Sequence, residues 1–205
     1  MKARRSPQLH AGSMADIAFL LLIFFLMTTV IETDQGILQK LPPEADAPEV
    51  VLRERNVLRI HLNKQDSLWC ENRVIPVDSL FRIARDFIDN GGSGPAAPDH
   101  CSYCQGRRSP ESSDSPMKAV VQLTHDRQTS YGFYIAVQDQ LSRAYANLRD
   151  REGLRRYGKS YSEMEAVVEN PLRSRQEAQS YAARLAELRE YYPIRILEPA
   201  SDPEH

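Results

Sequence analysis

The sequence predicts an α+β protein in which a single N-terminal transmembrane helix precedes a small domain of ββαβα(α)β order. The first observation is one long apolar run in a chain whose mean hydropathy, −0.50, is that of a hydrophilic protein. The second is a pair of segments, "NVLRIHLN" and "LWCENRVIP", in which apolar and polar residues alternate as in a β-hairpin. The third is a set of apolar stripes at helical spacing after these segments. Short strands mixed with amphipathic helices favour helices packed on one face of a sheet.

The apolar run is long enough to span a membrane only if it includes an acidic residue. The uncharged residues 17–31 would form about 22 Å of helix, whereas the hydrocarbon core of a bilayer is about 30 Å thick. A spanning helix must therefore extend back through Asp16, and we expect it over residues 13–33. Asp16 then lies within the membrane near one end. The alternative is that Asp16 marks the boundary and extends into the headgroups.

The residues that flank the run predict an uncleaved anchor and its orientation. A cleaved signal peptide would need a small-x-small site after the run, but "TTVIETDQGILQK" offers none. Basic residues precede the run and acidic residues follow it: Lys2, Arg4 and Arg5, then Glu32 and Asp34. By the positive-inside rule the N-terminus is cytoplasmic. In a bacterium with two membranes, the chain is then a single-pass inner-membrane protein whose C-terminal domain is periplasmic.

Beyond the run, the sequence predicts a linker and then a domain that begins near Asn56. The linker is rich in Pro, Glu and Asp and lacks helical periodicity. After the hairpin, "VDSLFRIARDFIDN" has the spacing of a helix with an Asp78 or Ser79 cap. We therefore divide the chain into a cytoplasmic N-terminus (1–12), a transmembrane helix (13–33), an extended periplasmic linker (34–55) and a periplasmic α+β domain (56–205).

Within the domain, residues 91–116 interrupt the pattern of strands and helices. More than half of them are Gly, Pro or Ser, so we expect a flexible insertion outside the core. A short strand over 119–123 follows, and then a long helix capped by Thr129 or Ser130, with an apolar stripe at Tyr134, Val137, Leu141, Ala144 and Leu148. The extended C-terminal helices include a second stripe at Tyr181, Leu185, Leu188 and Tyr192, and "IRILEP" is a candidate final strand.

The cysteines leave several chemical readings open. Cys101 and Cys104 have the Cys-x-x-Cys spacing of redox dithiols and of half a zinc site. They are either a local disulfide or inert pair, a metal clip completed by Cys70 or His125, or a redox site. Cys70 beside Trp69 is most simply a small buried residue.

Length, charge and motifs exclude several functions. The 205 residues suffice for one ordinary domain with appendages. The net charge of −2 lacks the basic excess of a nucleic-acid-binding protein, and three cysteines are too few for a disulfide scaffold. The chain has no glycine-rich phosphate loop, no Gly-x-Ser-x-Gly and no metal-spaced cluster. We therefore expect no enzyme activity, no cofactor and no metal.

The "ADIAFLLLIFFL" span, the "TTVIETDQGI" exit and the "LPP" linker resemble the ExbD/TolR family, in particular its long, Bacteroidetes-type variants. The resemblance implies a single-pass subunit of a Ton-type complex that uses the proton motive force to power transport across the outer membrane. It also implies an ExbB/TolQ-like polytopic partner around a homodimer of this subunit, and a TonB-like protein. The alternatives are a TolR-like subunit that maintains envelope integrity, and a plain anchored domain in which Asp16 has no role.

The resemblance also assigns candidate site residues. Asp16 is the candidate proton carrier, since an ionised carboxylate in hydrocarbon costs roughly 2.5 to 3.5 kcal/mol and persists where it faces a partner or a wet path. Thr28 and Thr29, expected on nearly the same helical face, are possible pore-facing residues or else satisfied helix-interior threonines. The linker residues Ile37, Leu41 and Pro42 fit a segment that pairs with a strand, and the alternative is an ordinary tether.

Overall fold

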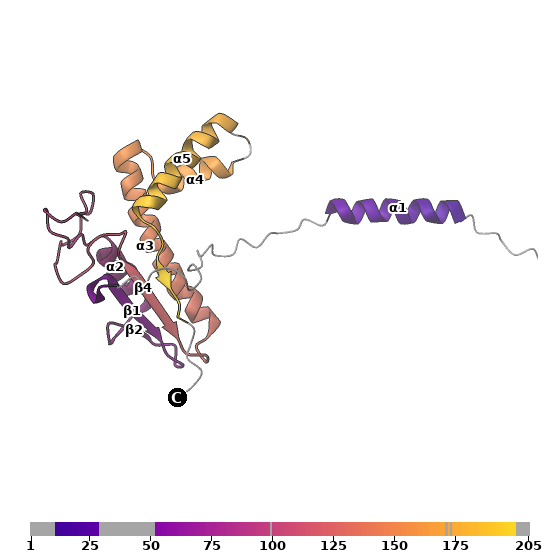
Figure 1. Cartoon of the computed structure of the whole chain (residues 1–205). Helices are drawn as coiled ribbons and strands as arrows, with labels where there is room; N and C mark the ends of the chain where they lie inside the picture. The colour runs from indigo at the N-terminus through magenta and orange to yellow at the C-terminus, as the bar shows by residue number, and fades with distance from the viewer. Residues whose placement is uncertain (1–10, 29–51, 99, 171, 173, 200–205) are drawn as a thin grey trace, which may run out of the picture. The chain divides into compact units, whose positions relative to one another are not determined.

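The structure is a computed structural model that describes residues 11–28, 52–98, 100–170, 172 and 174–199 (Figure 1). The chain divides into two compact units, Met1–Leu38 and Gln39–His205. In the first unit, the helix α1 covers Ala11–Thr28. The rest of the helix predicted over 13–33 lies outside the described residues. Among the helices that the structure describes, none is both long enough and apolar enough to cross a membrane.

The second unit contains a five-stranded mixed sheet of order β3-β2-β1-β4-β5. β1 lies at its centre, antiparallel to β2 and parallel to β4. β5 lies at the edge and pairs with β4 in parallel. The strands are β1 (Val57–Leu62), β2 (Leu68–Cys70), β3 (Arg73–Ile75), β4 (Val120–His125) and β5 (Ile196–Leu197). The predicted strands over "NVLRIHLN" and "IRILEP" and the strand before the long helix are confirmed.

The prediction of a single strand over "LWCENRVIP" is wrong, because the chain turns back in its middle. Glu71 and Asn72 both have positive φ, 45° and 62°, which is the backbone conformation of a tight hairpin turn. β2 and β3 therefore pair with each other in antiparallel fashion, with Cys70 opposite Arg73. The sheet gains an edge strand that the sequence pattern did not reveal.

The helices of this unit are η1 (Glu54–Asn56), α2 (Val77–Ile88), α3 (Tyr131–Tyr157), α4 (Tyr161–Glu169) and α5 (Arg175–Tyr191). Of the two predicted caps for α3, Ser130 is the one observed, since its side chain accepts a hydrogen bond from Phe133 N. The Asp78 or Ser79 cap of α2 is wrong, because Pro76 occupies the N-cap position. α4 was not predicted, although Ser160 and Glu163 form a capping box at its start.

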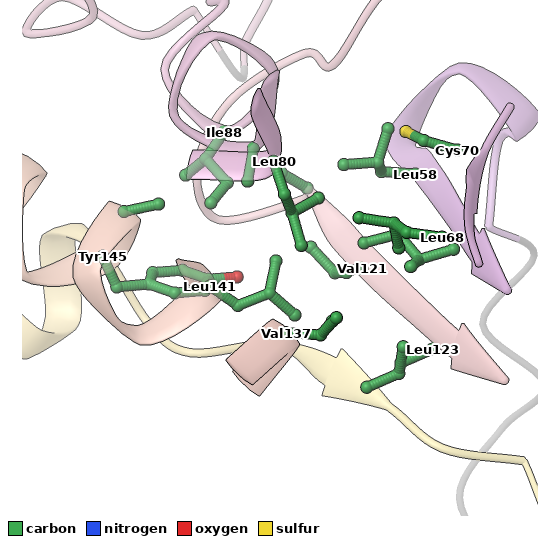
Figure 2. Close-up of a cluster of buried hydrophobic side chains, with 14 of the residues drawn as sticks. Leu58, Leu68, Cys70, Leu80, Ile88, Val121, Leu123, Val137, Leu141 and Tyr145 are labelled. Atoms are coloured by element: carbon green, nitrogen blue, oxygen red, sulfur yellow. The ribbon is translucent and has the colours of Figure 1, made fainter. Parts of the chain in front are cut away.

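Helices α2 and α3 cover one face of the sheet, as predicted. Leu58, Ile60 and Leu62 of β1 are buried, whereas the intervening Arg59 and His61 are exposed. Figure 2 shows side chains of α2 and α3 meeting those of β1, β2 and β4 in the main core. The labelled residues are Leu80 and Ile88 of α2, Val137, Leu141 and Tyr145 of α3, and Leu58, Leu68, Cys70, Val121 and Leu123 of the strands. α4 and α5 instead form a second cluster with Tyr161, Met164, Leu185 and Leu188.

The segment 91–116 does not stand outside the core, and that part of its prediction is wrong. Gly92 N donates to Ser113 O at 2.8 Å, so the two ends of the segment are joined. Tyr103 packs against the main core. Several further residues are buried: Ser93, Cys101, Cys104, Ser113, Asp114 and Ser115. The Gly, Pro and Ser residues form hydrogen-bonded turns here. Their number alone therefore gave the wrong expectation that the segment lies outside the core.

Candidate functional site

Helix α1 carries one charged residue, Asp16, in an otherwise uncharged sequence. At about 3.6 residues per turn, Phe19, Leu20 and Ile23 lie on the same side of the helix as Asp16. The described large apolar side chains of α1 are all exposed: Met14, Ile17, Phe19, Leu20, Leu21, Leu22, Ile23, Phe24 and Phe25. A helix that is apolar on every side requires apolar surroundings on every side.

Of the other predicted site residues, the structure describes only Thr28. Thr28 is the last residue of α1, and the twelve residues between the two positions correspond to about 3.3 helical turns. Thr28 is therefore displaced from Asp16 by about a third of a turn around the axis, and its role at the site stays a prediction. Thr29, Ile37, Leu41 and Pro42 lie outside the described residues.

The sheet face opposite α2 and α3 presents an aromatic side chain among polar ones. Trp69 of β2 is 38% exposed and lies opposite His61 of β1, whose ring Nδ1 is 3.1 Å from Thr124 Oγ1 of β4. These residues border a hollow of about 190 Å³, which is lined by Arg59, Ile60, His61, Trp69, Asn72, Gln122 and Thr124. Such a combination of a flat ring and hydrogen-bonding groups suits a ligand with both apolar faces and hydroxyl or amide groups.

A larger groove of about 750 Å³ lies where the start of β1, helix α2 and the insertion meet. Leu58, Ile83 and Phe87 give it an apolar part, and both Arg and acidic side chains line it. The mixture of charges selects no ligand class. The sequence could not indicate this groove, because the insertion that walls it was expected outside the core.

The Cys-x-x-Cys pair is a disulfide that joins Cys101 to Cys104, with Cα atoms 5.5 Å apart. The first of the readings left open by the sequence is therefore the observed one. Gly91 allows this arrangement, because it has a φ of +66° and a Cβ there would lie 2.7 Å from Cys104 Cβ. Cys70 is a buried free thiol, as predicted. Burial raises the pKa of Cys70 to about 11, which keeps the thiol protonated at neutral pH.

The disulfide loop places Tyr103 against the end of α5. The Tyr103 ring makes edge contacts with Tyr191 and Tyr192, at centroid distances of 4.9 and 5.5 Å. Its hydroxyl donates to Tyr191 O at 2.9 Å. Burial, with further contributions from Glu152 and other neighbours, raises the pKa of Tyr103 to about 12. The insertion and the C-terminal helices are thus packed against each other.

An ion pair between a buried carboxylate and a partly buried guanidinium lies beside this contact. Arg151 of α3 donates two hydrogen bonds to the Asp89 carboxylate, at 2.7 and 2.8 Å. The Tyr192 hydroxyl donates to Asp89 Oδ1 at 2.9 Å. Burial and the Asp89 charge raise the pKa of Tyr192 above its usual range. Sequence reasoning missed this cluster, because Asp89 and Tyr192 are far apart along the chain.

The geometry defines a class of protein: a small α+β domain of five strands in a chain that also carries one apolar helix with a single carboxylate. The chain matches the family model described as Biopolymer transport protein ExbD/TolR over residues 2–149. It therefore belongs to the ExbD/TolR family of biopolymer transport proteins. No curated protein matches the chain. The family match includes α1, β1 to β4, α2 and most of α3, so α4, α5 and β5 lie beyond it.

Proposed function

We propose that the chain is the ExbD-like subunit of a Ton-type complex that converts the proton motive force into transport across the outer membrane. In this proposal the N-terminal apolar run is a single inner-membrane span. The N-terminus is cytoplasmic and the α+β domain is periplasmic, in agreement with the charges that flank the run. Family membership supports the energy-transducing role.

The observation that carries the proposal is the single carboxylate, Asp16, on a helix that is otherwise apolar all round. A carboxylate in a membrane is retained where it faces a partner or a water-filled path. Asp16 takes up a proton that arrives from the periplasmic side, becomes neutral and changes its preferred contacts. It then releases the proton towards the cytoplasm. Moving one elementary charge through 100 mV supplies about 2.3 kcal/mol, enough to bias one helix against its neighbours.

The exposed side chains of α1 define the partner that this mechanism needs. Phe19, Leu20 and Ile23 share the Asp16 side of the helix and are more than a third exposed. Helices of an ExbB/TolQ-like polytopic protein would cover this side, around two copies of the present chain. A TonB-like protein would receive the resulting motion in the periplasm.

A pull-down from membranes, paired with complementation, tests the proposal. The wild-type chain should copurify with an ExbB/TolQ-like protein, and Asp16→Asn should copurify equally while failing to restore transport. Asp34→Asn makes the same chemical change outside the apolar run and should restore it. A fully active Asp16→Asn chain, or a wild-type chain without a multi-span partner, contradicts the proposal.

The exposed sheet face favours a second candidate function, a TolR-like role in envelope integrity. Trp69 beside Arg59, Asn72 and Gln122 offers a stacking surface with hydrogen-bonding groups, as a saccharide of peptidoglycan would require. Sedimentation with purified peptidoglycan tests this candidate. Binding that Trp69→Ala removes would support it, and a Pal or TolB gene neighbour would agree. Absence of binding and a TonB-like gene neighbour would exclude it.

A further inference from the structure

The start of the α+β domain is held by a buried polar pair. Asn56, the last residue before β1, donates from Nδ2 to Asp114 Oδ2 at 2.9 Å. In return, Asp114 N donates to Asn56 Oδ1 at 2.7 Å. The two residues are 3% and 0% exposed. These two hydrogen bonds give Asn56 Nδ2, Asn56 Oδ1, Asp114 N and Asp114 Oδ2 a partner each, whereas Asp114 Oδ1 has no hydrogen-bond partner among the described residues.

Two arginines of the incoming chain neutralise the buried Asp114 carboxylate. Arg55 forms an ion pair with Asp114, and Arg53 Nη1 lies 3.7 Å from its Oδ2. Arg55 also donates from Nη1 to Pro110 O at 2.7 Å. Arg53, Arg55 and Asn56 therefore all bind the insertion, and we call these contacts to Asp114 and Pro110 the clasp.

Further hydrogen bonds connect the insertion, and with it the clasp, to the end of helix α2. Asn90, two residues after the end of α2, donates from Nδ2 to Ser109 O and Ser113 O at 2.9 and 2.8 Å. Its Oδ1 accepts a hydrogen bond from Ser109 N at 3.0 Å. The Ser113 hydroxyl donates to Phe87 O. Asp114 directly follows Ser113, so the clasp is one residue from the anchor on α2.

The clasp changes what a pull on the incoming chain would break first. β1 is the central strand, and its first residue, Val57, pairs with Val120 of β4. Without the clasp, tension would fall directly on the ladder hydrogen bonds that join β1 to its neighbours. With the clasp, tension reaches charge-assisted contacts before it reaches Val57, and these are stronger than neutral hydrogen bonds.

We propose that the insertion takes up tension applied to the incoming chain, and that the contacts to Asp114 transmit this tension to it. We call the insertion in this role the brace. The clasp diverts force carried by the linker into Asp114, from which it passes both to the end of α2 and along the chain to β4, so that the β1 ladder carries less of it. This inference rests on the proposed function in one respect: the linker carries force when the complex works. It gives the insertion a mechanical purpose within the domain.

Single-molecule pulling on the full chain in detergent micelles tests the brace. One geometry places handles at Lys40 and Arg127, so that the force passes through the clasp. The other places them at Arg127 and Asn170, so that the force bypasses it. We expect Asp114→Asn to lower the rupture force roughly by half along the first path, because charge-assisted hydrogen bonds are about twice as strong as neutral ones. The second path should keep its wild-type force.

Matched variants distinguish loss of the clasp from a general effect of substitution at this end of the domain. Arg59→Gln removes a 3.6 Å ion pair with Glu54 at the same end of the domain but leaves the clasp intact, so the force should not change. The exchange Asn56→Asp with Asp114→Asn should recover much of the force, since it returns a carboxylate, and with it a charge-assisted hydrogen bond, to the pair. Should Asp114→Asn fail to fold, Arg55→Gln removes the ion pair from its partly exposed side and should lower the force along the first path alone.

An equal loss of force along both paths would reduce Asp114 to an ordinary stabilising residue and overturn the brace. An unchanged force along the first path would overturn it as well. The measurement uses neither a partner nor a proton gradient. A fully active Asp16→Asn chain would therefore contradict the proposed function while leaving the force result as it stands.

Discussion

Arg151 and Asp89 connect the family part of the chain to its C-terminal extension. The guanidinium of Arg151 donates to both oxygens of Asp89, and its Nη2 also donates to the Tyr192 hydroxyl at 2.8 Å. Asp89 follows α2, Arg151 lies on α3 and Tyr192 follows α5. The family match ends at residue 149, so Asp89 lies inside it and both partners lie outside. The extension is thus joined to the domain through a residue of the family region.

Replacing Asp89 by Asn should lower the free energy of unfolding by about 2 kcal/mol, since the partly buried Arg151 charge loses its carboxylate. Arg151→Gln should cost a similar amount, and the double variant should cost less than the sum of the two. Urea unfolding measures all three. Arg85→Gln is the control, because its 2.7 Å pair with Asp86 is partly exposed and should contribute under about 0.5 kcal/mol. Additive effects of the two substitutions would contradict a direct pair.

Two glycines should respond to alanine in opposite directions. Gly158 caps α3 with a φ of +67°, where a Cβ is strained, so Gly158→Ala should destabilise the domain by about 1 kcal/mol. Gly132 lies within α3, and a Cβ added there would meet no neighbouring atom within 4 Å, so Gly132→Ala should stabilise by about 0.5 to 1 kcal/mol. Thermal unfolding of the two variants gives both signs, and a Gly158→Ala chain as stable as wild type would contradict the assigned C-cap.

Loss of the disulfide should weaken the contact between the insertion and α5. Its loop is short, so replacing both Cys101 and Cys104 by Ser should cost about 2 kcal/mol. Hydrogen exchange near Tyr191 should also increase, because Tyr103 sits between the two cysteines. Urea unfolding with and without a reductant checks the first effect. A wild-type chain indifferent to the reductant would show that the bond adds no stability.

Cys70 should make stability fall at alkaline pH. Burial, with a smaller contribution from Glu71, raises its pKa from 9.0 to about 11 in the folded chain. Between these values the unfolded chain releases the proton and the folded chain keeps it, so rising pH favours unfolding. Cys70→Ala should flatten this part of the curve of unfolding free energy against pH. The Cys70 thiol of the wild-type chain should also be alkylated slowly. The control is a Val74→Cys thiol in the Cys70→Ala background, which should react faster because Val74 is 59% exposed.

Much of the fold could be predicted because its helices and central strands carry regular apolar patterns. The stripe through Val137, Leu141 and Leu148 is buried in the main core, and β1 alternates as expected. The β2–β3 turn was missed because its residues are Glu71 and Asn72, and neither a glycine nor a proline marks it. α4 was missed because it is short, although Ser160 and Glu163 form a cap pattern that the sequence does display.

Sequence could point to candidate site residues only where local sequence marks them. Asp16 stands out because the cost of a charge among apolar residues can be judged from the run itself. Asn56 and Asp114 pair across 58 positions, and Asp89 and Arg151 across 62, so no local pattern marks them. Buried polar residues of this kind look like ordinary loop residues until the fold brings their partners together.

Proton flux through Asp16 is the most direct test of the central claim. The chain and its ExbB/TolQ-like partner would be reconstituted in vesicles, and a pH-sensitive dye would follow flux under an imposed gradient. Wild type should conduct protons. Asp16→Asn should assemble with the partner and conduct none, because its side chain cannot titrate. Conduction by Asp16→Asn at the wild-type rate would contradict the claim that Asp16 carries the proton.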